Sequence, residues 1–340
     1  MQVVIIGAGL SGLICGRQLA RQGVDVKIID KSGGVGGRMA TRRLQGTQID
    51  HGAQYISPRG ADFSRFIAKL ESIGIVQPWT DRIYHLTTEG LQPPAAEEIY
   101  PRYACADGMT AIAKHLATDL NLQLKTRIVS ASYDIPSAQW QLTTDLGTQI
   151  YADAIVSAIP APQFLVIFEQ PLRELTDFIE AIAAVKFYPN VTVMAGYSQQ
   201  LKALPEWRAI RCIDNSILSW IGCDSSKHSQ EDQPNLQTTF IFQSTGAFAE
   251  QYLDETNLEP QGRVLLAEVG KLLDPVLAEP LWWQVHRWRY SIPQEVLGAD
   301  CLATRLPLPL VCTGDWCAGN NIEAAYLSGN AAAIALIKML

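Results

Sequence analysis

Positive charge is scarce in this sequence, and its cysteines and histidines form no recognisable pattern. Lys and Arg together number 27 against 34 Asp and Glu, which gives a formal net charge of −7. A protein that binds nucleic acid through the phosphate backbone needs a concentrated basic surface, so we expect no nucleic-acid partner. The seven cysteines form no C-x-x-C pair, which is typical of a reducing compartment. The five histidines lack ligand spacing, so no metal site is expected.

Long apolar runs are also missing. None approaches the roughly 20 residues that span a bilayer, and the apolar segment Met1–Ile6 runs straight into glycines without a charged leader. Apolar residues make up 48% of the chain and charged residues 18%, which excludes disordered and fibrous proteins. We expect a cytoplasmic globular enzyme without a membrane partner. The sequence does not determine the oligomeric state.

The first thirty residues predict one β-α-β unit. Val3–Ile6 is a short apolar run typical of a buried parallel strand. An amphipathic helical pattern follows over Leu10–Gln22 and stops at Gly23. Val24–Asp30 then predicts a second strand.

A G-x-G-x-x-G motif lies between the first strand and the helix. Gly7 allows a tight turn, Gly9 lets a pyrophosphate approach the backbone, and Gly12 lets helix and strand pack closely. Asp30 ends the next strand at the offset where a carboxylate meets a ribose, and the helix N-terminus attracts phosphate. The motif predicts a dinucleotide site without separating NAD from FAD. The alternative is an ordinary crossover turn with Asp30 solvated.

Two further segments favour FAD. The glycine-rich loop Gly33–Met39 contains Arg38 and can wrap a pyrophosphate from its other side, unless it is a plain surface loop. Near the C-terminus, Val311–Asp315 predicts a buried strand that ends in Gly-Asp, and Asn320–Ala325 leads into the helix Glu323–Leu340. The N-terminus of that helix would stabilise negative charge on a reduced flavin, and Asp315 could hold a ribityl hydroxyl. The alternative is that Asp315 and Asn321 only cap helices.

The rest of the chain predicts an α/β fold with two interleaved domains. A Rossmann-type FAD-binding domain is expected over 1–54, 101–160 and 302–340, and an α+β substrate domain on a mixed or antiparallel sheet over 55–100 and 161–301. Apolar runs predict further strands of the first domain at Leu124–Val129, Ala154–Ile159 and Leu308–Thr313, and a hairpin at Trp140–Thr144 and Thr148–Tyr151. Strands of the second domain are predicted at Val191–Gly196, Ile217–Gly222, Thr238–Gln243 and Val285–Ser291.

These residues resemble the FAD-dependent oxidoreductases of the amine oxidase and p-hydroxybenzoate hydroxylase fold group. The resemblance covers essentially the whole chain and is greatest to the renalase-type enzymes. The segments that carry it are Gly7–Gly12, Asp30, Gly36–Arg42, Asp50–Tyr55, Tyr103–Met109, Arg127–Val129, His286–Tyr290 and Gly314–Asp315. The chain departs from the family pattern at one point, because Ala324 follows Glu323 where the family usually has glycine.

The resemblance implies specific contacts to FAD. Leu10 and Ser11 would meet the pyrophosphate, Asp30 and Lys31 the adenosine ribose, and the backbone of Val129 the adenine. The other implied cofactor contacts are Gly7, Gly9, Gly12, Gly37, Arg38, Met39, Gln54, Tyr55, Gly314, Asp315, Asn321, Ile322 and Ala325. No cysteine stands where monoamine oxidases tether the flavin, so FAD is expected to bind noncovalently.

The resemblance also implies a reaction. Renalase-type enzymes oxidise isomeric dihydronicotinamide nucleotides by hydride transfer to flavin N5, with O₂ as acceptor, and give NAD(P)+ and H₂O₂. That transfer needs alignment and no acid or base, so no catalytic side chain is expected. Amine oxidation in this group usually shows a lysine near N5. None falls in the late aromatic strand, and Lys271 lies in the predicted helix Arg263–Leu273.

The late aromatic strand and one loop provide the candidate substrate contacts, which are His51, Tyr55, Trp288 and Tyr290. Alternation places Trp282, Gln284, His286, Trp288 and Tyr290 on one face of the strand, where they could enclose a nicotinamide ring. Arg287 and Arg289 on the other face could meet phosphate at the rim. The alternative is an aromatic face packed in the core. Asp50 is expected to brace its loop.

Three other functions stay open. A flavin amine oxidase or a polyene desaturase would share the fold, the first with a lysine at N5 and the second with an apolar entrance. A regulator could hold FAD as a structural group. A plain NAD-dependent dehydrogenase would be colourless.

Overall fold

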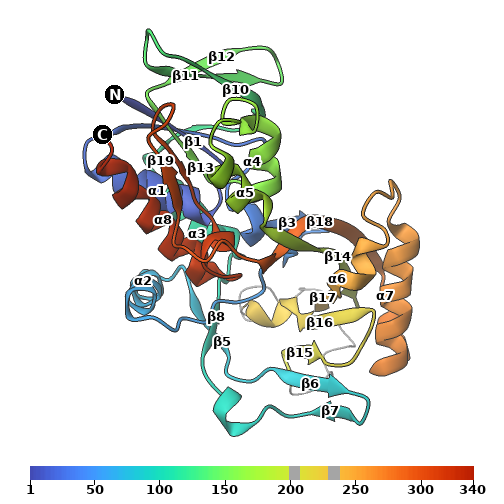
Figure 1. The fold of residues 1–340 in the computed structure, drawn as a ribbon. Coiled ribbons are helices and arrows are strands. Elements are labelled where there is room, and N and C mark those ends of the chain that lie inside the picture. The colour runs from blue at the N-terminus through green and yellow to red at the C-terminus, as the bar shows by residue number, and fades with distance from the viewer. Residues whose placement is uncertain (199–206, 229–237) are drawn as a thin grey trace. The chain divides into compact units, whose positions relative to one another are not determined.

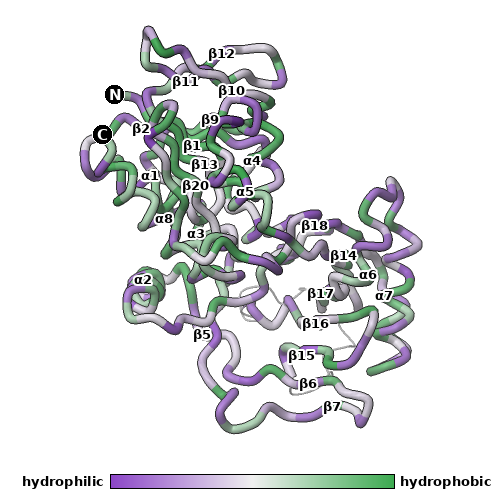
Figure 2. Tube along the Cα trace, in the orientation of Figure 1, coloured by the Kyte–Doolittle hydropathy of each residue, from purple (hydrophilic) through white to green (hydrophobic). Residues whose placement is uncertain are grey.

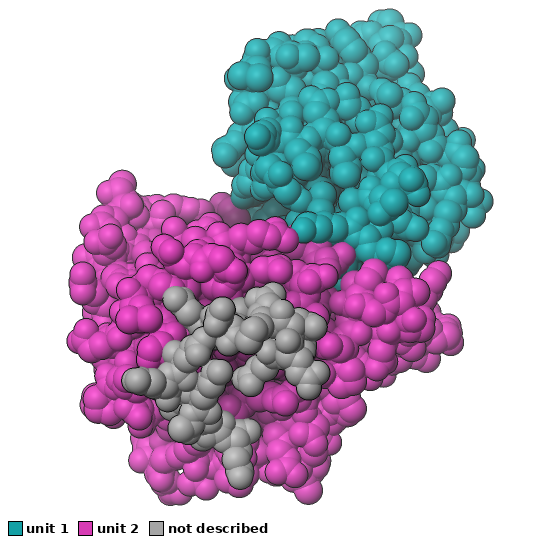
Figure 3. Space-filling model, turned by 180° about the vertical axis from the view of Figure 1, so that it is seen from behind, with its two compact units in different colours: residues 1–38, 112–187, 292–340 teal, residues 39–111, 188–291 magenta. Residues whose placement is uncertain are grey.

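The computed structural model describes residues 1–198, 207–228 and 238–340, which form two compact units. Unit 1 contains residues 1–38, 112–187 and 292–340, and unit 2 contains residues 39–111 and 188–291 (Figure 3). All four changes of unit fall inside helices or strands, namely the 3-10 helix η1 (Gly37–Met39), the helix α3 (Thr110–Ala117) and the strands β14 (Lys186–Tyr197) and β18 (Trp282–Glu295). Sequence patterning gives no signal inside a continuous element, and the boundaries expected from the sequence differ from these by 10 to 27 residues.

Unit 1 is built on a six-stranded sheet in the order β19-β20-β13-β1-β2-β9. All neighbours are parallel except β19 and β20. The strands are β1 (Gln2–Ile6), β2 (Asp25–Ile29), β9 (Asn121–Gln123), β13 (Ala154–Ser157), β19 (Leu302–Thr304) and β20 (Leu310–Cys312). Most residues of β1, β13 and β20 are buried and apolar (Figure 2), which agrees with a parallel sheet covered on both faces. The predicted β-α-β unit and Rossmann-like fold are confirmed.

The two faces of this sheet carry different layers. The helices α1 (Leu10–Arg21) and α8 (Ile322–Ile337) lie side by side (Figure 1), and α1 packs over Ile5 and Ile28. The opposite face buries Val4 and Ile6 in a core with Trp140. That core is completed by the three-stranded sheet β10 (Ile128–Asp134), β11 (Gln139–Thr144) and β12 (Gln149–Ala152), and by the helices α4 (Ala161–Phe168) and α5 (Thr176–Ala183). The predicted hairpin is therefore confirmed as β11 and β12.

One predicted strand of unit 1 is wrong. The run Leu124–Val129 was expected to return to the large sheet, but the strand that pairs with β2 is β9, which ends at Gln123. Lys125 then takes a positive φ of 53°, a left-handed conformation that ends extended structure. Its backbone N–H donates to Ser32 O at 2.9 Å, outside the sheet, and the chain bends there.

Unit 2 is built on a mixed seven-stranded sheet in the order β18-β14-β17-β16-β15-β6-β7. Its remaining strands are β6 (Tyr84–Thr87), β7 (Gly90–Gln92), β15 (Ala209–Cys212), β16 (Leu218–Cys223) and β17 (Thr238–Ser244). The pairs β14–β17, β17–β16, β16–β15 and β6–β7 are antiparallel, and β15–β6 is parallel. The predicted mixed sheet is confirmed.

Helices and hairpins complete unit 2. The helix α7 (Glu259–Leu272) buries Leu265, Leu266 and Val269 against Phe240 and Phe242 of the sheet. The other helices are α2 (Ala61–Ser72) and α6 (Gly246–Glu250), and the two hairpins are β3 (Thr41–Leu44) with β4 (Thr47–Asp50) and β5 (Gln77–Thr80) with β8 (Arg102–Ala104).

Within the described residues, the 3-10 helices are η1 (Gly37–Met39), η2 (Ala96–Glu98), η4 (Asp224–Lys227), η5 (Pro275–Ala278) and η6 (Asp315–Cys317). Among the residues that the structure describes, no helix combines the length and apolar character needed to cross a bilayer.

Candidate functional site

The turn between β1 and α1 contains two glycines that the fold itself requires. Gly7 has a φ of 110°, and a Cβ there would lie 2.7 Å from Ala158 O. A Cβ on Gly12 would lie 2.1 Å from Gly7 O, so only glycine lets α1 pack this closely. Gly9 differs, because its φ of −75° suits any residue and a Cβ would meet no heavy atom of the described residues within 4 Å. Packing does not explain the glycine at position 9, because a side chain there would point into open space.

The first turn of α1 faces the same space. Gly9 is the N-cap of the helix, and Leu13 N donates to Gly9 O at 3.0 Å. The N–H groups of Leu10, Ser11 and Gly12 occupy the positions where an α-helix has no intrahelical acceptor. The positive end of the helix dipole adds to them, so this end of α1 attracts an anion.

Asp30 connects the glycine turn to the loop after β2. One carboxylate oxygen accepts from Ala8 N at 2.7 Å and the other from Ser32 N at 2.7 Å. A carboxylate has about four acceptor positions, so capacity for a ribose hydroxyl remains. Lys31 beside it is exposed, and desolvation by its neighbours together with the cation Arg127 lowers the pKa of its ammonium against the opposing effect of Asp30.

The glycine-rich loop docks on the glycine turn. Gly36 N donates to Ala8 O at 2.8 Å, and a Cβ on Gly37 would lie 3.4 Å from Gly9 Cα. The loop ends at Arg38, whose guanidinium binds Asp315 in two parallel contacts, Nη1–Oδ2 at 2.8 Å and Nη2–Oδ1 at 2.5 Å. The structure thus joins the two chain ends of unit 1, since the carboxylate predicted to meet the ribityl chain orients the arginine predicted to meet the pyrophosphate.

The C-terminal elements fit the flavin prediction in part. A Cβ on Gly314 would lie 2.4 Å from Trp316 Nε1, so glycine is required before η6. Asn321 caps α8, because its Oδ1 accepts from Ala324 N at 2.8 Å. Ile322 is the first residue of the helix, where a backbone N–H has no intrahelical acceptor. Ala325 N donates to Asn321 O at 3.2 Å, so its own N–H is committed within the helix.

Val129 stands at an irregularity in the pairing of β10 with β11, between Ile128 and Ser130. Its side chain is 40% exposed, which is unusual for a valine in a strand. The residue is therefore accessible where an adenine contact was predicted.

Met39, Gln54 and Tyr55 belong to unit 2. Met39 O accepts from the Thr110 hydroxyl at 3.0 Å. Gln54 is buried, and its Nε2 donates to Asp50 O and to Gly52 O, the latter at 3.0 Å. Tyr55 stacks on Trp220 with ring centroids 5.5 Å apart.

The candidate substrate residues His51 and Trp288 lie together in unit 2. Their rings stack with centroids 5.2 Å apart, and His286 meets both rings edge-on at 4.9 and 4.6 Å. Trp288 Nε1 also donates to His51 O at 2.8 Å. His51 Nδ1 is buried without a hydrogen-bond partner in the part of the chain that the structure describes. We call His51, His286 and Trp288 the ring cluster. His286 and Trp288 are half-buried, and His51 is buried against them.

Both histidines of the ring cluster are neutral at physiological pH. Burial, then His286 and Arg42, lower the pKa of His51 to about 3. Burial, then Arg42 and Arg287, lower the pKa of His286 to about 4. Arg42 itself is held by Gln284 at 2.7 Å. The ring cluster therefore has no proton to give near neutral pH.

The depressed pKa of His51 predicts that the free energy of unfolding depends on pH. Between pH 3 and 6.5 the unfolded chain binds a proton at His51 that the folded chain does not, so stability falls as the pH drops through that window. From pH 7 to pH 5 the loss through His51 is about 2 kcal/mol. Urea unfolding of the wild type and of His51→Asn should show a shallower pH dependence in the variant. Equal slopes would contradict the assignment of a neutral buried histidine.

The opposite face of β18 has a structural role. Trp283 and Val285 pack in the core under α7. Arg287 and Arg289 donate to backbone carbonyls of the segment 252–255. The predicted alternation of β18 agrees with these contacts, but the two arginines bind the protein's own backbone, which does not fit the expected phosphate rim. Trp282 packs with Ile49 and Met194, in agreement with the core alternative.

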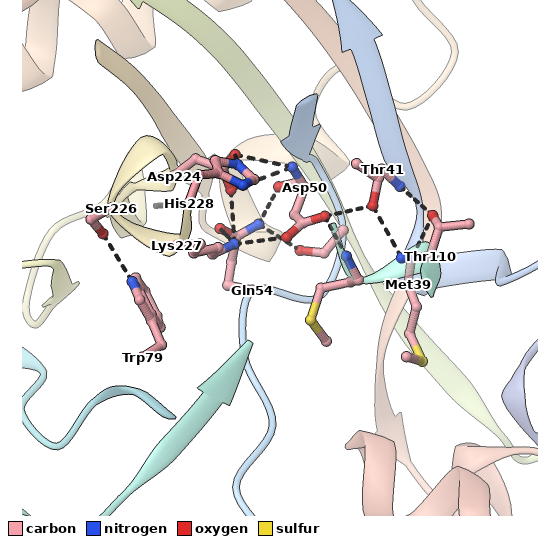
Figure 4. A network of polar contacts seen from close by, with 12 residues as sticks. Met39, Thr41, Asp50, Gln54, Trp79, Thr110, Asp224, Ser226, Lys227 and His228 are labelled. Atoms are coloured by element: carbon pink, nitrogen blue, oxygen red, sulfur yellow. Dashed lines mark hydrogen bonds and ion pairs between the residues drawn. The ribbon is translucent and has the colours of Figure 1, made fainter. Parts of the chain in front are cut away.

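A buried ion cluster lies beside the loop 50–55 and was not predicted from the sequence (Figure 4). Lys227 is completely buried, and its Nζ donates to Asp224 Oδ1 at 2.8 Å, to Asp50 Oδ2 at 3.1 Å and to Gln54 Oε1 at 3.3 Å. His228 Nε2 lies 3.8 Å from Asp224 Oδ2. We call Asp50, Gln54, Asp224, Lys227 and His228 the Lys227 cluster.

The charges of the Lys227 cluster support one another. Burial alone would lower the pKa of Lys227, but Asp224 and Asp50 outweigh it and raise that pKa. Asp224 is buried too, yet Lys227 and His228 bring its pKa below the ordinary value. Burial lowers the pKa of His228, but Asp224, the carbonyl of Ala106 and Asp50 together raise it above the ordinary value. Burial raises the pKa of Asp50 against the opposing effect of Lys227.

Asp50 braces its loop, as the sequence suggested. Its Oδ1 accepts from the Thr41 hydroxyl at 2.6 Å and from Met109 N at 2.8 Å. Its backbone N–H donates to Asp224 Oδ1 at 3.3 Å. These contacts connect β3, β4 and the segment before α3 at one carboxylate.

Comparison with known proteins gives matches along the whole chain. The model of the NAD(P)-binding Rossmann-like domain matches residues 5–70, and that of the flavin containing amine oxidoreductases matches residues 79–337. Renalase from Mus musculus is 23% identical over 351 aligned residues, covering 100% of this chain and 98% of that protein.

Solved structures agree on the fold. Putrescine oxidase bound to putrescine aligns with a TM-score of 0.76 at 14% identity over 99% of both chains. Cyclohexylamine oxidase from Brevibacterium oxydans aligns with a TM-score of 0.74 at 14% identity over 99% of this chain and 98% of that one.

Proposed function

Because this chain belongs to the renalase-like flavin containing amine oxidoreductases, we propose that it oxidises isomeric dihydronicotinamide nucleotides with O₂ as the electron acceptor. The balanced reaction converts one dihydronicotinamide nucleotide, O₂ and a proton into NAD(P)+ and H₂O₂. The full-length similarity to renalase supports the flavin-dependent oxidoreductase class, and the side chains of unit 2 support the substrate class.

We propose that unit 1 holds FAD noncovalently. The room at Gly9, the first turn of α1 and the Arg38–Asp315 pair fit a pyrophosphate. Asp30 fits the adenosine ribose. Cys317, close to the ring end of this site in sequence, is buried, and burial raises the pKa of its thiol to about 12, which makes a thiolate link to a flavin unfavourable.

The bound flavin would supply hydride acceptance and reoxidation by O₂. The chain's part is to align a planar donor and to exclude water. His286 and Trp288 of the ring cluster are half-buried and can meet a planar ring, whereas His51 is buried against them. Neither step needs a proton from the protein.

The observation that carries the substrate proposal is that neither the histidines of the ring cluster nor Lys227 is available as a base near neutral pH. Oxidation of an amine proceeds from the neutral amine, so a residue that accepts its proton is useful. His51 and His286 have pKa values of about 3 and 4. All three N–H donors of the Lys227 ammonium meet protein oxygens. Hydride donation by a dihydropyridine makes no such demand.

The experiment is anaerobic reduction of the bound flavin by two classes of donor. Isomeric dihydronicotinamide nucleotides should bleach the visible flavin band in the stopped flow, whereas putrescine and cyclohexylamine should leave it unchanged. Bleaching by amines alone would refute the substrate proposal and favour a flavin amine oxidase. A flavin that no donor reduces would favour the non-catalytic regulator.

A further inference from the structure

The Lys227 ammonium has no donor left for a ligand. An ammonium has three N–H donors, and here Asp50, Gln54 and Asp224 each supply an acceptor oxygen within 3.3 Å. The side chain is fully buried, and its Nζ lies 5.3 Å from the centre of the Trp79 ring. A lysine in this position organises protein groups and does not take a proton from a substrate.

Lys227 fixes the orientation of the Gln54 amide. Because Lys227 only donates, it must face the amide oxygen of Gln54, which directs the amide nitrogen to Asp50 O and Gly52 O. Gly52 O also accepts from Gln243 Nε2 at 3.0 Å. The carbonyls of the loop 50–55 are thus tied to a side chain whose direction Lys227 determines.

The same loop carries the residues proposed to meet the flavin and the substrate. His51 lies in the ring cluster, where its carbonyl accepts from Trp288. Tyr55 stacks on Trp220. A change in the fold of the loop would therefore move His51, Gln54 and Tyr55 together.

We propose that Lys227 is a positioning residue, which acts through the Gln54 amide to hold the loop 50–55 in the geometry that substrate oxidation requires. The inference rests on the proposed function, in that Gln54 and its neighbours are taken to border the flavin. Stability alone is a poor reason for this arrangement, because well-packed apolar side chains often replace a buried ion pair without loss. Apolar side chains have no hydrogen-bond donor, so they could not orient the Gln54 amide as the Lys227 ammonium does.

The test uses a charge-balanced variant and a double-mutant cycle. Lys227→Met with Asp224→Asn removes one charge of each sign and the donor to Gln54, and Gln54→Met removes the amide. The pair Lys186→Gln with Glu295→Gln is the matched control, since these exposed side chains form a 3.1 Å ion pair in unit 1. The readouts are flavin content, the visible spectrum and midpoint potential of the bound flavin, and the rate of its anaerobic reduction.

The charge-balanced variant is expected to keep its flavin, to shift the spectrum and potential, and to slow reduction roughly 10-fold to 100-fold. In the Gln54→Met background the same pair should change the rate by no more than about twofold, because the two sites act through one amide. The control should match the wild type. Additive effects, or a wild-type spectrum and rate in the charge-balanced variant, would overturn the proposal.

A conservative variant covers the case in which the charge-balanced protein does not fold. Lys227→Arg keeps the charge but not the ammonium position, so it should fold, bind flavin and show an intermediate rate and potential. A wild-type reduction rate and potential in Lys227→Arg would show that Lys227 contributes only to stability. The two proposals fail separately: a wild-type flavin that no dihydronicotinamide reduces refutes the proposed function, while its spectrum and potential still report the coupling of Lys227 to Gln54.

Discussion

Replacing Gly9 by alanine is expected to abolish tight FAD binding while leaving the flavin-free protein folded. The φ of −75° and ψ of 178° at Gly9 suit alanine, and its Cβ would meet no described heavy atom within 4 Å. The methyl group would instead occupy the room proposed for the pyrophosphate. We expect the dissociation constant of FAD to rise by about 100-fold or more, which is about 3 kcal/mol. Titration of the apoprotein with FAD, followed by fluorescence, measures it.

Gly12→Ala provides the contrast. Its Cβ would lie 2.1 Å from Gly7 O, so this change should destabilise unit 1 whether or not FAD is present. Thermal unfolding of the two flavin-free variants should therefore differ, with Gly9→Ala close to the wild type. Unaltered FAD affinity in Gly9→Ala would remove the pyrophosphate from this turn. A large loss of apoprotein stability in Gly9→Ala would show that packing, and not a ligand, requires glycine there.

Replacing Lys227 by methionine is expected to destabilise the protein strongly. The side chain is fully buried, and the variant would leave Asp50 and Asp224 together without their ammonium. Removing one partner of a buried ion pair costs about 3–5 kcal/mol. The free energy of unfolding of the flavin-free protein, from urea denaturation, should fall by that amount.

Adding Asp224→Asn to Lys227→Met should restore a large part of this loss, because one unmatched charge is removed. Asp50 keeps its hydrogen bonds from Thr41 and Met109 in that variant. Lys271→Met is the control, since Lys271 is exposed and lies 3.9 Å from Glu268. Two results would contradict the proposed charge balance of the cluster. One is a loss of unfolding free energy below about 1 kcal/mol in Lys227→Met, the usual range of an exposed pair. The other is a further loss when Asp224→Asn is added.

Sequence patterns predicted the parts of the fold that local signals determine. The glycine spacing after Val3–Ile6 predicted the turn and the start of α1, because Gly7 and Gly12 are needed within a few residues of the strand. The hairpin of β11 and β12 was predicted from its alternation and its turn. The strand predicted over Leu124–Val129 was wrong because the sequence pattern gives no local signal for the positive φ at Lys125, where extended structure ends.

The Lys227 cluster could not be predicted because its contacts are distant in sequence. Lys227 meets Asp50 and Gln54 across 177 and 173 residues. The local pattern of Asp224 three residues before Lys227 is equally typical of an exposed turn. The acidic residues of both chain regions carry no mark of burial in the sequence. A pairing between the loop 50–55 and η4 becomes visible only once β17, β16 and the β3–β4 hairpin are packed.

The flavin contacts proposed for unit 1 remain predictions, and the structure adds one relation to them. The sequence assigned Arg38 and Asp315 to different parts of the cofactor, whereas the two side chains bind each other. They lie 277 residues apart, and nothing in either motif indicates the other. For Arg287 and Arg289 the sequence predicted contacts to a phosphate, whereas both side chains donate to backbone carbonyls of the protein. The sequence of a strand gives no sign that a carbonyl is the partner of its arginine.

The most direct test of the account is the stoichiometry of one turnover. The purified protein is reduced under argon with one equivalent of an isomeric dihydronicotinamide nucleotide per flavin, then exposed to oxygen, and the oxidised nucleotide and peroxide are measured. We expect one NAD(P)+ and one H₂O₂ for each flavin, with the yellow colour restored. Recovery of the nucleotide unchanged from a flavin that never bleached would contradict it.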